Sequence, residues 1–368
     1  MVQKSSFSSV QNVPWVCKQF DREKCHSRAS NCIIWESTAR PCIQTNRFSD
    51  EIEPLPIHTV TGPIPASEAG RTLSHEHVLC DLWAFTKTYD GILDDESLAI
   101  SELAQYRDAG GSSLVDATSG GLGRNPLALR RISEATGIRI IMGAAWYREC
   151  VYPAIVWERD ANALADLIVN DLVQGADGTN VRAGIIGEIG TERKHITPAQ
   201  ERVFRAAARA QRRTGACIMT HTTHFGELAM EQIALLREEG VPAGRIVISH
   251  LGDRHDTTAL LKIAGEGVFL SVDNIGYVGG GYPPDEVRMR NLRLLAAEGH
   301  LAQIVLGGDI CQKSHLAAYG GKGYAHVLRS FLPLLRANGI QEDAIYQMTV
   351  ANPARMLDIE ENSVDHQN

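Results

Sequence analysis

The chain has 368 residues, of which 44% are hydrophobic and 22% charged, so it has a globular composition and enough length for a large core. Its net charge of −8, without a basic stripe, excludes a general nucleic-acid binder. No apolar run approaches the roughly 20 residues that span a bilayer, and no export signal is apparent. We therefore expect a cytoplasmic protein without membrane contact, whose eight cysteines are free thiols.

Residues 1–54 differ from the rest of the chain. They mix Ser, Asn, Gln, Arg and Cys with no sustained period of 2 or 3.6 residues. We predict a poorly ordered or atypical N-terminal tail at 1–54 and a single catalytic domain at 55–360. Residues 57–64, with the turn at Gly62-Pro63, begin that domain as a short β-hairpin.

From residue 73 onward, apolar β-rich runs alternate with helical patterns. The eight predicted strands lie within 73–79, 111–118, 138–145, 181–189, 216–221, 245–250, 267–273 and 303–309. Helices are predicted at 95–109, 126–136, 161–174, 198–213, 225–239, 257–264 and 285–298, followed by a helical region at 323–357 in two pieces. This alternation indicates an α/β fold, a (β/α)8 TIM barrel. An open doubly wound sheet is the rival, but no GxGxxG turn follows the first strand.

Potential metal ligands stand at the ends of several predicted strands, where a barrel places its functional residues. His75 and His77 lie two residues apart in the first strand, so their side chains point the same way. Four later strands end in a histidine or a carboxylate: Glu188, His221, His250 and Asp309. Imidazole and carboxylate ligands favour Zn²⁺, with Mn²⁺ or Co²⁺ as alternatives.

The order and spacing of these motifs resemble the phosphotriesterase family of the amidohydrolase superfamily. The matching pieces are residues 62–65, 73–77, 183–191, 221, 249–253, 308–309 and 319–324. The resemblance implies two divalent metal ions, one bound by His75, His77 and Asp309 and the other by His221 and His250. A group on the fourth strand bridges both ions in that family.

The bridging position separates branches of the family. Classical phosphotriesterases use a carbamylated lysine, whereas the fourth strand here carries Glu188 and no lysine. The chain therefore resembles the phosphotriesterase homology and lactonase branch, in which a glutamate bridges. That branch implies a small lactone, carboxylic ester or amide as substrate, with a phosphotriester as the alternative.

The chemistry implied is hydrolysis by a metal-bridging hydroxide, because two Zn²⁺ ions lower the pKa of a shared water toward neutrality. Asp309 is the candidate catalytic residue that takes the proton and passes it to the leaving group. A non-catalytic ligand-binding barrel is the second alternative. An open metal position argues against it, since a purely structural zinc site is closed.

Loops after the strands carry residues that we predict to contact the substrate: Trp83, Tyr147, Arg148, Arg254, Tyr277 and Lys313. Lys322 also follows Asp309 in the chain. Cations on several loops suggest a small-molecule substrate with an anionic group, although solvated loop charges are the alternative. Asp253 either orients a ligand imidazole or caps a helix. A homodimer is one option for the assembly.

Overall fold

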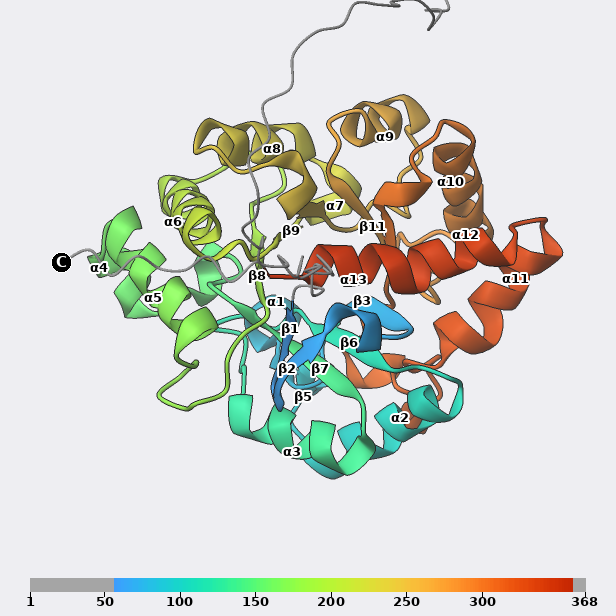
Figure 1. Cartoon of the computed structure of the whole chain (residues 1–368), viewed down its shortest axis with the longest axis horizontal. Coiled ribbons are helices and arrows are strands. Elements are labelled where there is room, and N and C mark those ends of the chain that lie inside the picture. The colour runs from blue at the N-terminus through green and yellow to red at the C-terminus, as the bar shows by residue number, and fades with distance from the viewer. Residues whose placement is uncertain (1–55, 360–368) are drawn as a thin grey trace, which may run out of the picture. The chain divides into compact units, whose positions relative to one another are not determined.

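The computed structural model describes residues 56–359, so the predicted tail at 1–54 lies outside the described residues. Eight parallel strands form a nearly closed barrel and follow one another in chain order (Figure 1). They are β3 (Thr72–Glu76), β6 (Ser113–Asp116), β7 (Arg139–Ala144), β8 (Ile185–Gly190), β9 (Ile218–His221), β10 (Ile246–Ile248), β11 (Phe269–Val272) and β12 (Ile304–Leu306). Backbone hydrogen bonds join the region of the first strand to the segment after the last strand. Asp309 N donates to His75 O (3.0 Å), and His77 N donates to Ile310 O (3.1 Å). The predicted (β/α)8 barrel is confirmed.

Helices surround the strands in Figure 1. Their bounds are α1 (Trp83–Thr86), α2 (Glu96–Asp108), α3 (Pro126–Thr136), α4 (Ala154–Glu158), α5 (Ala161–Val173), α6 (Pro198–Thr214), α7 (Thr223–Gly226), α8 (Ala229–Glu238), α9 (Thr257–Ala264), α10 (Asp285–Ala297), α11 (Leu332–Ala337), α12 (Glu342–Tyr346) and α13 (Asn352–Leu357). Wider π-helical turns at Val327–Phe331 and Gln347–Ala351 extend α11 and join α12 to α13. The last helical region is thus split near residue 338, as the sequence predicts.

Local signals in the sequence fix several helix ends. The Thr197 side chain accepts from the backbone N–H of Gln200, and the Gln200 side chain accepts from the N–H of Thr197, which is a capping box at the start of α6. Asn125 caps α3, which begins at Pro126 and ends at Gly137 with a φ of 73°. These caps satisfy backbone groups that the helix itself leaves unpaired.

The N-terminal end of the barrel is closed by apolar side chains. Branched residues of successive strands fill the interior: Val115, Ile141, Ile185, Val247 and Val305. Ile57 belongs to the antiparallel hairpin of β1 (Pro56–Thr59) and β2 (Gly62–Pro65), and it joins this cluster together with Met356 and Leu357 of α13. Val60 N donates to Ile140 O at 2.9 Å, which ties the hairpin turn to β7. The predicted hairpin is therefore confirmed. Because this end of the barrel is filled with apolar side chains, the candidate polar residues lie at the opposite, C-terminal end of the strands.

Two short strands, β4 (Cys80–Asp81) and β5 (Ile92–Leu93), pair antiparallel in the loop region after β3. Within residues 56–359, no helix combines the length and the apolar character that crossing a membrane requires.

Candidate metal centre

Strand β3 and the residue directly after it supply two buried histidines, His75 and His77, which we call the β3 histidines. His75 is fully buried and His77 is 2% exposed. The intervening Glu76 serves a different purpose, because its carboxylate accepts from the backbone N–H groups of Gly308 (2.5 Å) and Ile310 (3.0 Å). The alternation of side chains along the strand therefore separates two imidazoles from a carboxylate that binds the β12 loop.

Glu188 lies near the C-terminal end of β8, as the sequence predicts, two residues before the last residue of the strand. The pairing of β8 with β9 shifts register between Ile186 and Ile189. Gly187 has a φ of 119°, and a Cβ there would lie 2.2 Å from the carbonyl oxygen of Met219. Only glycine fits this position, and the irregularity presents Glu188 to the histidines of β3.

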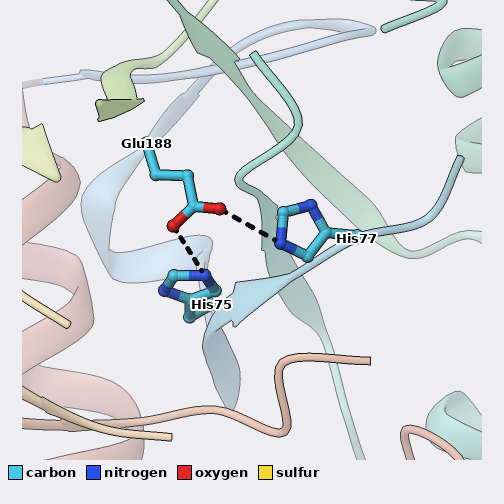
Figure 2. A group of neighbouring side chains, drawn as sticks. All are labelled: His75, His77 and Glu188. Carbon is cyan, nitrogen blue, oxygen red and sulfur yellow. Dashed lines mark ion pairs between the residues drawn. The ribbon is translucent and has the colours of Figure 1, made fainter. Parts of the chain in front are cut away.

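The Glu188 carboxylate lies close to four histidines at the ends of strands β3, β9 and β10. Its Oε2 lies 3.4 Å from His75 Nε2, 3.3 Å from His221 Nδ1 and 3.9 Å from His250 Nε2. Its other oxygen, Oε1, lies 3.5 Å from His77 Nε2. Figure 2 shows one carboxylate oxygen directed to each β3 histidine.

These side chains make two groups that could hold a metal ion, and Glu188 belongs to both. One group is His75, His77 and Glu188, and the other is Glu188, His221 and His250. Two of the ligand atoms, His75 Nε2 and Glu188 Oε2, are buried without a hydrogen-bond partner among residues 56–359. A buried polar atom without a partner is costly, and a bound cation would satisfy both.

Asp309 follows β12 and joins the first of these groups. Its Oδ1 lies 3.3 Å from His77 Nε2 and 3.7 Å from His75 Nε2. The structure thus brings together all six residues that the sequence selected as metal ligands, because His221 and His250 also approach to 2.8 Å between ring nitrogens.

A second set of side chains orients the imidazoles. Asp273 Oδ1 lies 2.9 Å from His250 Nδ1, and its Oδ2 accepts from the His250 backbone N–H at 3.1 Å. Thr118 Oγ1 lies 2.9 Å from His77 Nδ1, and Ser249 Oγ lies 3.1 Å from His75 Nδ1. Such partners fix the ring and leave Nε2 free for a metal.

Asp273 is the functional residue that sequence reasoning missed. Asp253, considered there for this role, instead pairs with the buried Arg288 at 2.6 Å and accepts from Asn274 at 2.8 Å. The signal for Asp273 was present, since it ends the apolar run 267–273 as the other candidates end theirs.

The electrostatics favour the cation-binding forms of Glu188 and His221, whereas nearby carboxylates outweigh burial at His77 and His250 and raise their pKa values to about 9, mainly through Asp309, and to about 10, mainly through Asp273. Burial disfavours charge on Glu188, but the imidazoles of His75 and His221 outweigh it and hold the pKa of the carboxyl well below its usual range. Burial lowers the pKa of His221 to about 4. An ionised carboxylate and a neutral imidazole are the protonation states that a metal ion requires.

The residues predicted to contact substrate occupy different surroundings. The Tyr147 hydroxyl lies 3.1 Å from both ring nitrogens of His221, and Trp83 is 41% exposed in α1. Arg148 pairs with Glu192, and its guanidinium lies 5.1 Å from the ring centre of Phe85.

The other two cations also lie in separate places. Arg254 donates to the carbonyl of Phe225 at 2.9 Å. Lys313 lines a narrow space beside α2, together with Asp94 and Asp95. The three predicted cations therefore have different protein neighbours.

Tyr277 lines a pocket of about 440 Å³ beside Asp309, which we call the Tyr277 pocket. Its walls are residues 275–280 and 282 after β11 and residues 310–312, 314–315 and 321–322 after β12. The Tyr277 hydroxyl contacts the carbonyl oxygen of Asp309 and lies 2.6 Å from His315 Nδ1. The pocket thus begins at the segment that carries Asp309.

A (β/α)8 barrel with clustered histidines and carboxylates at the C-terminal ends of its strands defines a class of metal-dependent hydrolases. Comparison with known sequences gives the family: the chain belongs to the phosphotriesterase family, whose sequence model matches residues 55–357. The family relationship predicted from the sequence motifs is thereby confirmed.

Three relatives show the range of this similarity. The chain is 36% identical over 288 residues to the phosphotriesterase homology protein of Escherichia coli (strain K12). This alignment covers 78% of this chain and 98% of that protein. The chain is 33% identical over 341 residues to the N-acetyltaurine hydrolase of Xenopus tropicalis, covering 82% and 97%. Among solved structures, a lactonase from Listeria monocytogenes is 30% identical with a TM-score of 0.78, covering 83% of this chain and 99% of that one.

Proposed function

We propose that this protein is a hydrolase that uses two divalent metal ions to cleave a lactone, carboxylic ester or amide. Zn²⁺ is the metal that we propose, and Mn²⁺ and Co²⁺ are the alternatives. The observation that carries the proposal is that one carboxylate, Glu188, belongs to both candidate metal groups. In this proposal His75, His77 and Asp309 hold one ion and His221 and His250 hold the other. Glu188 bridges them, as a bidentate carboxylate can.

The ions would activate a water molecule and polarise the scissile carbonyl group. Water adds to the carbonyl carbon, the C–O or C–N bond breaks, and the departing alcohol or amine gains a proton. We assign the proton transfer to Asp309, whose carboxylate lies on the side of His75 and His77. Asp273, Ser249 and Thr118 would hold the imidazole rings in a fixed orientation during this step.

Two observations support a carbonyl substrate. The fourth strand carries a glutamate at the bridging position, where the sequence has no lysine to carbamylate. The relatives of this chain include a lactonase and an N-acetyltaurine hydrolase, which are named for a cyclic ester and an amide. The substrate of this chain is therefore proposed as a small acyl compound, and an anionic group on it is developed below.

The test has two stages, metal content and then turnover. The protein is loaded with Zn²⁺, Mn²⁺ or Co²⁺, and its metal content is measured by mass spectrometry. Turnover is then followed with γ-lactones, aryl esters, N-acyl amino acids and a paraoxon-type triester.

We expect about two ions per chain, one for each group, and faster turnover of at least one carbonyl class than of the triester. A preference for the triester would favour the phosphotriester alternative. Full metal content with no turnover of the whole panel would favour the ligand-binding barrel. Binding of a single ion would contradict the binuclear centre.

A further inference from the structure

The cationic residues near the mouth of the barrel differ in whether they line the Tyr277 pocket. Arg148 is paired with Glu192, and Arg254 donates to the carbonyl of Phe225. Lys313 lines its narrow space together with two aspartates. None of these three lines the Tyr277 pocket.

Lys322 is different, because it lines the Tyr277 pocket and forms no ion pair with any residue between 56 and 359. None of the described residues that line this pocket is acidic. Lys322 also borders a neighbouring pocket that Glu102 lines, but the Glu102 carboxylate already accepts from the backbone N–H groups of Ala317 and Ala318.

The backbone beside Lys322 is shaped to admit its side chain. Gly276 has a φ of 102°, and a Cβ at this position would lie 3.3 Å from Lys322 Cγ and 2.8 Å from His326 Cδ2. Glycine therefore leaves room for the lysine stem against the β11 loop. The Lys322 side chain is exposed overall, and its stem passes beside that loop.

A second donor lines the same pocket. Tyr282 packs edge-on against Tyr277, with ring centres 5.1 Å apart, and against Phe225 at 5.3 Å. Its hydroxyl makes no hydrogen bond with another residue in the described range 56–359. The pocket thus combines a lysine cation and a phenolic donor with aromatic and aliphatic walls.

We infer that the Tyr277 pocket recognises an oxyanion on the substrate, a carboxylate or a sulfonate, through Lys322 with help from Tyr282. This inference rests on the proposed hydrolase function and narrows its substrate class to acyl compounds that carry a negative charge away from the scissile bond. It also replaces Lys313 with Lys322 as the cation that selects the substrate. Lysine suits this role as a point charge on a flexible stem.

The experiment compares a charged substrate with a neutral one of nearly the same shape. The pair is N-acetyl-β-alanine and N-acetyl-β-alaninamide, and N-acetyltaurine is added to distinguish a sulfonate from a carboxylate. The metal-loaded wild type is compared with Lys322→Ala, Lys322→Arg and Tyr282→Phe. Lys313→Ala is the matched control, because it removes one positive charge from the same loop region outside the pocket.

We expect the wild type to favour the anion in kcat/KM, chiefly through KM. Lys322→Ala should reduce the ratio of anionic to neutral kcat/KM by about two- to fivefold, the range of an exposed ion pair. Lys322→Arg should retain most of the ratio, and Lys313→Ala should leave it as in the wild type. Raising the ionic strength should lower the ratio in the wild type more than in Lys322→Ala.

Calorimetric binding of the same compounds separates this inference from the proposed function. If none of them is hydrolysed, the amide part of the proposed function fails, while tighter binding of the anions that is lost in Lys322→Ala still supports the oxyanion pocket. Equal binding and turnover of charged and neutral compounds by the wild type would overturn the inference. So would an anion preference that survives Lys322→Ala.

Discussion

The Glu76 carboxylate binds the backbone on both sides of Asp309. It accepts from Gly308 N at 2.5 Å and from Ile310 N at 3.0 Å, and it is fully buried. Asp309 itself has a φ of 52°, a region that residues other than glycine adopt only when their surroundings hold them there. The residue between the two β3 histidines therefore fixes the conformation of a third candidate metal ligand.

We predict that Glu76→Gln lowers turnover as well as stability. The glutamine amide would turn a donor toward one of the two backbone N–H groups, and one buried hydrogen bond would be lost. The expected cost is about 2 kcal/mol of unfolding free energy. The fall in kcat of the metal-loaded enzyme should exceed that of the control below.

The matched control is Glu102→Gln. Glu102 is also buried, and its carboxylate accepts from Ala317 N at 3.1 Å and Ala318 N at 2.8 Å, away from Asp309. Denaturant unfolding should show a similar loss of stability for both variants. If both lose kcat equally, Glu76 has no particular role in holding Asp309.

Exchange of the shared carboxylate should affect both candidate metal groups. Glu188→Gln removes the negative charge that His75, His77, His221 and His250 surround. We expect metal content to fall below that of the wild type and turnover to fall by about a thousandfold, since Lewis-acid activation contributes several kcal/mol. Mass spectrometry of the metal and steady-state kinetics check this.

Glu192→Gln is the control for a carboxylate outside the centre, because Glu192 pairs with Arg148. It should keep its metal. Normal metal content in Glu188→Gln would contradict the bridging role.

Asp309→Asn should separate metal binding from proton transfer. The amide keeps an oxygen that faces His77, but it cannot accept a proton from the attacking water. We expect most of the metal to remain and kcat to fall by about 100- to 10,000-fold, the usual contribution of general acid–base catalysis. Full activity with the metal retained would exclude the proton-transfer role.

Asp273→Asn should weaken metal binding without removing a ligand. The carboxylate contacts both Nδ1 and the backbone N–H of His250, so its loss frees the ring and lowers the basicity of Nε2. We expect an affinity loss of about 10- to 100-fold in competition with a chelator. Ser249→Ala removes only a neutral hydroxyl from His75 and should cost less. An unchanged affinity in Asp273→Asn would show that His250 needs no such support.

Much of the fold could be predicted from the sequence alone. Apolar runs of strand length alternate with amphipathic helices, and this periodicity reflects burial of strands on both faces and of helices on one. Elements with strong end signals, such as α3 between Pro126 and Gly137, were placed at their observed bounds. The six candidate ligands could be selected because polar residues at the ends of buried strands are costly unless they have a function.

The sequence could not decide geometry that depends on distant parts of the chain. Glu188 was predicted near the end of its strand, but the register shift beside Gly187 could not be predicted from the sequence. Asp273 was overlooked although it ends an apolar run, and only the folded structure shows that His250 contacts Asp273 whereas Asp253 pairs with Arg288.

The two lysines that follow Asp309 also could not be distinguished from the sequence alone. Lys313 and Lys322 both follow Asp309 in the chain, and nothing local distinguishes them. The fold directs Lys313 to a narrow space beside α2 and Lys322 to the pocket beside Asp309. The sequence by itself determined the barrel, the family and the types of ligand, because periodicity and residue chemistry are local. The tertiary structure decided which carboxylate is shared, which aspartate contacts a histidine and which lysine lines the pocket beside Asp309, because each depends on loops that only the closed barrel brings together.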